Sequence, residues 1–144
     1  MAAFTIQTVI IYLMTGVSLV GTACAQAKVS PDDKYDKQEA MILMRDGIKL
    51  HTVIFTPKEQ KEPLPFLMER TPYGAQNYPS PEKVPYVKDM AEDGYIFVYQ
   101  DIRGRYGSEG SYVMQRVPRD KNDPKAIDES TDTYDTFDWL LQHV

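Results

Sequence analysis

The sequence predicts an α/β fold in which an antiparallel hairpin leads into a strand, helix, strand unit. Two short apolar runs, 40–45 and 48–55, flank an Asp-Gly dipeptide, which supplies the positive φ that a tight hairpin turn requires. Two further runs, 65–69 and 95–100, enclose a segment with helical spacing, and strands joined in this way are expected to be parallel neighbours. The 144 residues, 42% of them apolar, amount to about one domain.

The N-terminal segment predicts export. No charged side chain occurs from Met1 to Ala27, and the apolar run 8–20 is too short to span a bilayer comfortably. Ala23-Cys24-Ala25 fits the small-x-small cleavage pattern of secretory signal peptides. We therefore expect residues 1–25 to be a signal peptide, the mature protein to be periplasmic or secreted, and no stable membrane span to remain. Acylation of Cys24 as a lipoprotein is a second interpretation.

A polar stretch follows the expected leader. Residues 26–38 contain few apolar side chains and no periodic pattern, which is typical of a tail rather than of a core segment. The folded domain is expected to occupy residues 39–144.

The titratable residues exclude several classes of site. Cys24 is the only cysteine, so a disulfide scaffold, a cysteine-based zinc site and a cysteine nucleophile are excluded. His51 and His143 fit no metal-ligand spacing, and we expect no metal and no cofactor. We place His51 on a strand face and His143 near the C-terminal end of a helix. The sixteen Lys and Arg residues form no block and the net charge is -5, so nucleic acid is not an expected partner.

A single apolar face predicts the helix between the two parallel strands. The residues on this face are Val84, Val87, Met90 and Ala91, at the spacing of a helix. Pro85 suits the first turn and Gly94 suits the position just past the end. The following strand, 95–100, is apolar without alternation, as is a strand covered on both faces.

The C-terminal third predicts a long loop and a second helix. From Arg103 to Lys125 the chain contains Gly and Pro but no period, and such a stretch in a compact domain commonly serves a site or a lid. Residues 128–143 predict an amphipathic helix with an apolar face formed by Tyr134, Phe137 and Leu141. Its acidic residues are expected on a solvated face; they are Asp128, Glu129, Asp132, Asp135 and Asp138.

Several segments, in this order, resemble the X-Pro dipeptidyl-peptidase and cocaine-esterase family of serine hydrolases. They are Met44–Gly47, Arg70–Gly74, Gly94–Gly104, Ser108–Gly110 and Asp128–Trp139. Within this family, residues 101–114 and 132–140 are most similar to the α-amino acid ester hydrolases, which are also described as acylases. The resemblance implies that residues 39–144 are the N-terminal part of an α/β-hydrolase domain with a Ser-Asp-His triad, and that the complete protein carries a helical cap and a jelly roll.

The resemblance also implies a role for Tyr73. In this family the matching tyrosine lends its hydroxyl to the oxyanion hole. The local sequence suits such a role, because Pro72 limits the backbone before the tyrosine and Gly74 lets the chain turn away after it. Without the resemblance, a tyrosine in such a turn is more often a turn residue that packs its ring.

A second group of polar residues follows the strand at 95–100. Asp101 and Arg103 are a carboxylate and a guanidinium two residues apart at a strand end, and such pairs usually hold a loop by hydrogen bonds and charge pairing. We interpret Asp101, Arg103 and Gly104 as structural support. Ligands in open α/β sheets bind beyond the carboxyl ends of the strands, so Tyr73 and this group are expected at one edge.

The sequence contains no nucleophile elbow. Gly-x-Ser-x-Gly does not occur, and Ser108 has flanking glycines at the wrong offset, so we do not expect it to be the nucleophile. In the family the elbow follows one strand after the helix that here ends near His143. We therefore expect an N-terminal fragment, truncated before the elbow and inactive alone.

Three functions stay open. The first is an exported serine hydrolase that cleaves small-molecule esters or amides of α-amino acids through an acyl-enzyme. The second is an X-Pro dipeptidyl-peptidase or a carboxylesterase, which uses the same chemistry with a different pocket. The third is a non-catalytic truncated secreted product. A homo-oligomer is compatible with each of them.

Overall fold

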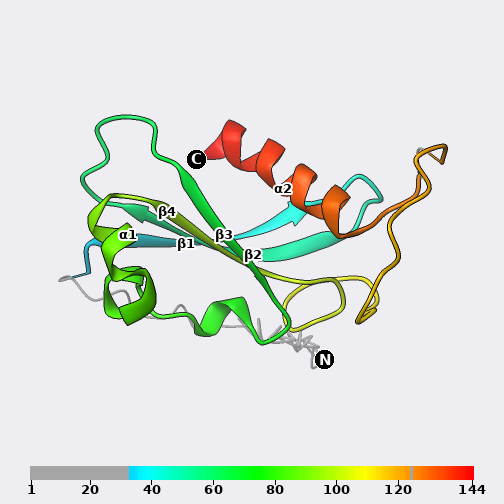
Figure 1. Cartoon of the computed structure of the whole chain (residues 1–144), viewed down its shortest axis with the longest axis horizontal. Helices are drawn as coiled ribbons and strands as arrows, with labels where there is room; N and C mark the ends of the chain where they lie inside the picture. The colour runs from blue at the N-terminus through cyan, green and yellow to red at the C-terminus, as the bar shows by residue number, and fades with distance from the viewer. Residues whose placement is uncertain (1–32, 124) are drawn as a thin grey trace, which may run out of the picture.

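The computed structural model describes residues 33–123 and 125–144, which form a four-stranded mixed sheet with its longest helix on one face (Figure 1). The expected signal peptide lies outside the described residues, as does most of the expected polar tail. The strands are β1 (Tyr35–Leu43), β2 (Lys49–Pro57), β3 (Phe66–Thr71) and β4 (Ile96–Asp101), and the α-helices are α1 (Lys88–Glu92) and α2 (Glu129–His143). In the described part of the chain, no helix is long and apolar enough to cross a membrane.

The predicted hairpin is confirmed. β1 pairs antiparallel with β2, and Gly47 adopts a φ of 91° in the turn between them. The first strand begins earlier than expected, however, because Tyr35 is a core residue that is only 2% exposed. Its hydroxyl donates to the carbonyl oxygens of Ala91 at 3.0 Å and Tyr95 at 3.1 Å. Residues 35–38 therefore belong to the sheet rather than to a polar tail.

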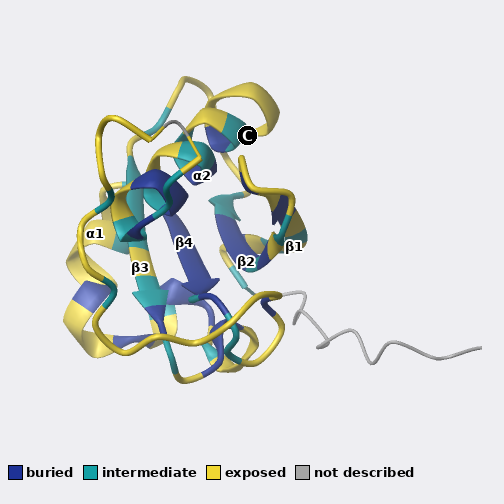
Figure 2. Cartoon of the chain, turned by 90° about the vertical axis from the view of Figure 1, so that its right-hand side faces the viewer, coloured by how far each residue is buried: buried dark blue, intermediate teal, exposed yellow. Residues whose placement is uncertain are grey.

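The predicted pair of parallel strands is also confirmed. β3 pairs parallel with β4, from Phe66 opposite Ile96 to Thr71 opposite Asp101. β2 pairs antiparallel with the other side of β4, so the strand order is β1-β2-β4-β3. Every residue of β4 is buried, as Figure 2 shows. The continuous apolar run of this strand thus reflects its position in the interior of the sheet.

The crossover between these strands contains less α-helix than expected. Three 3-10 turns at 75–77, 81–83 and 85–87 precede α1, which has five residues. Prolines stand at the first position of two of these turns, and Val84, which precedes Pro85, is extended with φ -101° and ψ 108°. A proline disfavours the helical conformation in the residue before it, so the turns do not merge into one longer helix. Val84 and Val87 are buried as predicted, whereas Met90 is exposed.

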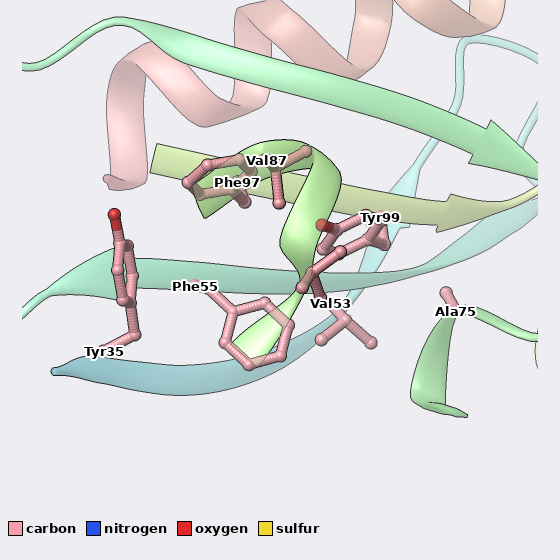
Figure 3. Close-up of a cluster of buried hydrophobic side chains, with 8 residues drawn as sticks. Tyr35, Val53, Phe55, Ala75, Val87, Phe97 and Tyr99 are labelled. Atoms are coloured by element: carbon pink, nitrogen blue, oxygen red, sulfur yellow. The ribbon is translucent and has the colours of Figure 1, made fainter. Parts of the chain in front are cut away.

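Apolar side chains cover both faces of the sheet, in the alternation that a strand imposes. On one face, Val53, Phe55, Phe97 and Tyr99 pack against the crossover (Figure 3). On the other face, Ile54, Ile96 and Val98 pack against Leu140 of α2.

The predicted apolar face of α2 is wrong in two of its three residues. Tyr134 and Leu141 are 67% and 76% exposed, whereas Phe137 is partly buried and lies edge-on to Phe66. The buried residues of α2 are Thr131, Asp132, Thr136 and Leu140, and the last three lie at i, i+4 and i+8 on one face. Polar residues therefore occupy contact positions that the apolar pattern alone could not identify.

Candidate functional site

The segments after β3 and β4 leave the sheet at the same edge. The two strands are parallel and Thr71 lies opposite Asp101, so the residues that follow them are neighbours. The amide of Ile102 donates to the Thr71 carbonyl at 3.1 Å, which continues the pairing beyond the strands. Tyr73 lies in the first of these segments and is 75% exposed. Its ring is therefore available to a ligand at the carboxyl edge of the sheet, where ligands of open α/β sheets bind.

The turn that carries Tyr73 is fixed at several points. The Asp101 carboxylate accepts a hydrogen bond from the Ala75 amide, with 2.7 Å between Oδ1 and N. Arg105 Nε donates to the Pro72 carbonyl at 3.3 Å. Gly74 has a φ of 98°, and a Cβ at this position would lie 2.8 Å from Asn77 Nδ2. A side chain at position 74 would be strained in both its backbone and its contacts.

Asp101 joins three segments of the chain. Its side chain is fully buried, and besides Ala75 it accepts the Gly107 amide at 3.2 Å and lies 3.0 Å from His51 Nδ1. The Asp101 carbonyl accepts from the Ser108 hydroxyl at 2.6 Å. These are the contacts that a supporting role requires, and they leave the Ser108 hydroxyl bound to the main chain.

Arg103 links the hairpin turn to α2. Its guanidinium makes two hydrogen bonds to Asp132, of 2.7 and 2.6 Å, and two to Asp46, of 2.6 and 3.1 Å. Burial disfavours the charged form of Arg103, but its bonds to Asp132 and Asp46 outweigh this effect and raise its pKa. The hydrogen bond from Arg103 lowers the pKa of the Asp46 carboxyl. Arg103 thus holds two separate elements against the loop after β4.

Gly104 is required by the shape of the same loop. Its φ is 66°, and a Cβ there would lie 2.3 Å from the backbone nitrogen of Tyr112. Only a residue without a side chain allows the two parts of the loop to approach this closely.

The acidic residues of α2 are not all solvated, contrary to the prediction from sequence. The side chain of Asp132 is only 1% exposed, and it also accepts a hydrogen bond from Arg70 Nη2 at 3.2 Å. Arg70 Nη1 contacts the Glu129 carboxylate at 2.6 Å. Asp135 pairs with Arg45 of the hairpin at 2.6 Å. The acidic run therefore anchors α2 to arginines from the hairpin and the strand ends.

His51 is a polar residue whose connection to this edge was missed from sequence, where it was placed only on a strand face. Its Nδ1 lies 3.0 Å from Asp101 Oδ2, and its Nε2 lies 3.1 Å from Glu39 Oε2. The signal was the register: Thr52 pairs with Gln100, so His51 falls beside Asp101 on one face of the sheet. Burial tends to raise the pKa of Glu39, but hydrogen bonds from His51 and Lys37 outweigh burial and lower this pKa.

Tyrosines and an arginine line the exposed side of this edge. The Arg105 guanidinium lies 4.9 Å from the ring centre of Tyr112 and 5.7 Å from that of Tyr106, within the range of cation–π attraction. Tyr106 and Tyr112 are both exposed. Within residues 33–123 and 125–144, no group of three or more His, Cys, Asp or Glu side chains is arranged to hold a metal ion.

The fold and this edge define the N-terminal part of an α/β-hydrolase domain, in which a mixed sheet is accompanied by few helices. Residues 46–143 match the X-Pro dipeptidyl-peptidase (S15) family. The chain belongs to this family.

Individual relatives agree with this assignment. Cocaine esterase from Rhodococcus sp. (strain MB1 Bresler) is 32% identical over 107 residues, which are 71% of this chain and 16% of the esterase. A solved α-amino acid ester hydrolase is 40% identical with a TM-score of 0.69, over 89% of this chain and 22% of that protein. An aminopeptidase from a marine sediment Thaumarchaeota archaeon is 37% identical with a TM-score of 0.67, over 90% and 23%. The chain thus spans less than a quarter of the length of these relatives.

Proposed function

We propose that this chain is the N-terminal part of an exported serine hydrolase that cleaves esters or amides of α-amino acids. The observation that carries the proposal is the position of Tyr73, exposed at the carboxyl edge of β3 on a turn that Asp101 and Arg105 hold in place. In the proposed reaction a serine attacks the substrate carbonyl, the bond to the alcohol or amine breaks, and this group leaves with the serine's proton. Water then hydrolyses the acyl-enzyme to the free acid and the free serine. The likeness to an α-amino acid ester hydrolase, at 40% identity, supports the choice of substrate.

Tyr73 has the chemistry that an oxyanion hole needs. A phenol is a neutral donor on a rigid arm, so it can donate to the oxygen of the tetrahedral intermediate without accepting the developing charge itself. One such donor contributes about 3 kcal/mol to lowering the barrier. The hydrogen bonds to Pro72 and Ala75 on both sides of Tyr73 favour a fixed backbone, which keeps this donor oriented before the substrate arrives.

The nucleophile is proposed to lie beyond residue 144. Gly-x-Ser-x-Gly is absent from the sequence, and the Ser108 hydroxyl is bonded to the Asp101 carbonyl while it accepts the His51 amide at 2.8 Å. Reading the coding DNA past Val144 tests this directly. A strand followed by a serine elbow is the expected result, and a stop codon would favour a non-catalytic secreted product.

The substrate class is tested on the polypeptide that includes the elbow. We expect an α-amino ester to be hydrolysed faster than an X-Pro amide or a plain acyl ester, and a quenched reaction to show a mass increase of one acyl group on a serine. Preference for the X-Pro amide would favour the second candidate, an X-Pro dipeptidyl-peptidase. The family match and the archaeal aminopeptidase support that alternative.

A further inference from the structure

We propose that His51 is a positioning residue for the turn that carries Tyr73, and that it acts through the Asp101 carboxylate. His51 lies on β2, and its ring nitrogens face Asp101 and Glu39. The importance of the turn for catalysis rests on the proposed function of Tyr73. The hydrogen bonds that connect His51 to the turn through Asp101 are independent of that function.

The two oxygens of Asp101 connect His51 to the turn. Oδ2 lies 3.0 Å from His51 Nδ1 and Oδ1 lies 2.7 Å from the amide nitrogen of Ala75. A carboxylate is planar and rigid, so a rotation that breaks one of these bonds also misaligns the other. The Asp101 side chain is fully buried, so water cannot easily replace a lost donor. Oδ2 also accepts the Gly107 amide at 3.2 Å. The orientation of Asp101, and with it the Ala75 bond, therefore depends on His51 together with this backbone amide.

The imidazole of His51 is itself held in one orientation. Its Nε2 lies 3.1 Å from Glu39 Oε2, and its backbone amide donates to Ser108 Oγ at 2.8 Å. Gly107 packs directly against the ring, since a Cβ at that glycine would lie 2.8 Å from His51 Cγ. A side chain at position 107 would displace the ring from Asp101. The contact thus explains why the loop after β4 has a glycine here.

Two carboxylates compete for the protons of this ring. The protonated ring donates to both Glu39 and Asp101, whereas the neutral ring donates to only one of them. Asp101 is buried, while the side chain of Glu39 is 47% exposed and also contacts Lys37 Nζ at 3.1 Å. Loss of a hydrogen bond therefore costs more at Asp101 than at Glu39. The difference in burial therefore favours the tautomer that carries a proton on Nδ1, facing Asp101.

Two substitutions of His51 by an amide side chain distinguish the contact of Nδ1 with Asp101 from the contact of Nε2 with Glu39. In His51→Asn the amide nitrogen takes about the place of Nδ1 and can still donate to Asp101. In His51→Gln it reaches about the place of Nε2, toward Glu39. The readout is hydrogen exchange of the Ala75 amide measured by NMR, relative to the amide of Val98 in the centre of β4, which reports the stability of the sheet.

We expect His51→Gln to accelerate exchange at Ala75 relative to Val98 about tenfold, and His51→Asn to keep the ratio within about twofold of the wild type. The control Glu39→Gln leaves the contact between His51 and Asp101 intact, so we expect it to keep the wild-type ratio of exchange at Ala75 to exchange at Val98. Equal ratios in His51→Asn and His51→Gln would overturn the proposal, as would parallel changes at Ala75 and Val98, because packing alone would then explain the effect.

Turnover in a form that includes the nucleophile separates this proposal from the proposed function. We expect His51→Gln to lower kcat about tenfold with little change in KM, and His51→Asn to restore it. If the exchange ratios follow the prediction while Tyr73→Phe turns over normally, His51 positions the turn and the catalytic role of Tyr73 fails. If the exchange ratios do not follow it, the His51 proposal fails whatever Tyr73 does.

Discussion

Replacing Asp132 with asparagine should destabilise the fold strongly. Asp132 has a side chain 1% exposed and receives hydrogen bonds from Arg103 and Arg70. The asparagine has nearly the same shape but no charge, so the buried Arg103 guanidinium keeps only Asp46 as a countercharge. Removing one partner of a buried ion pair costs about 3 to 5 kcal/mol. We expect a loss of about 3 kcal/mol, which is a large part of the stability of a typical domain.

Urea unfolding followed by circular dichroism measures this loss. The denaturant midpoint should fall while the slope m stays unchanged, because the surface exposed on unfolding is the same. Glu129→Gln is the matched control: it lies on the same helix and pairs with Arg70, but its side chain is 46% exposed, so we expect a loss below about 1 kcal/mol. Equal losses in the two variants, or a loss below about 0.5 kcal/mol in Asp132→Asn, would show that burial does not strengthen the Asp132 ion pair.

Two further predictions concern the loop after β4 and the response to acid. Gly104→Ala should lower the unfolding free energy by about 3 kcal/mol, because its Cβ would lie 2.3 Å from Tyr112 N. The control Gly47→Ala also has a positive φ but open space around the new Cβ, and it should cost about 1 kcal/mol. Equal losses in the two variants would contradict the steric argument. The folded-state pKa values of Asp46 and Asp135 are lowered by Arg103 and Arg45, with burial opposing the shift. The ionised Asp46 and Asp135 therefore stabilise the fold above the unfolded carboxyl pKa of about 4, and this stabilisation is lost as the pH falls below that value. Urea midpoints that stay unchanged between about pH 6 and pH 3 would contradict this.

Local sequence patterns predicted the strands well. The hairpin was evident from Asp46-Gly47, whose turn geometry depends on neighbouring residues alone. β4 was evident because a strand buried on both faces is apolar at every position. The start of β1 was misplaced because Tyr35 is a single aromatic among polar residues, and its partners Ala91 and Tyr95 are distant in sequence.

The candidate site was predicted only where a motif marks it. Tyr73 was singled out by the family resemblance, whereas Asp101 and Arg103 were identified by their positions at a strand end. The burial of Asp132 and the contacts of His51 were missed, because both depend on long-range partners. Neither residue has a local pattern that distinguishes it from a solvated acid or an ordinary strand histidine. Combining the hairpin register with the strand order was the step needed to bring His51 next to Asp101.

The proposed donation from the Tyr73 hydroxyl to the oxyanion is tested by measuring the kcat of Tyr73→Phe. The measurement uses the polypeptide that includes the nucleophile, with Tyr86→Phe as the matched control, since Tyr86 is an exposed tyrosine in the 3-10 turn at 85–87. We expect Tyr73→Phe to lower kcat about a hundredfold with KM little changed, and the control to stay within about twofold of the wild type. An unchanged kcat in Tyr73→Phe would contradict the proposed donation.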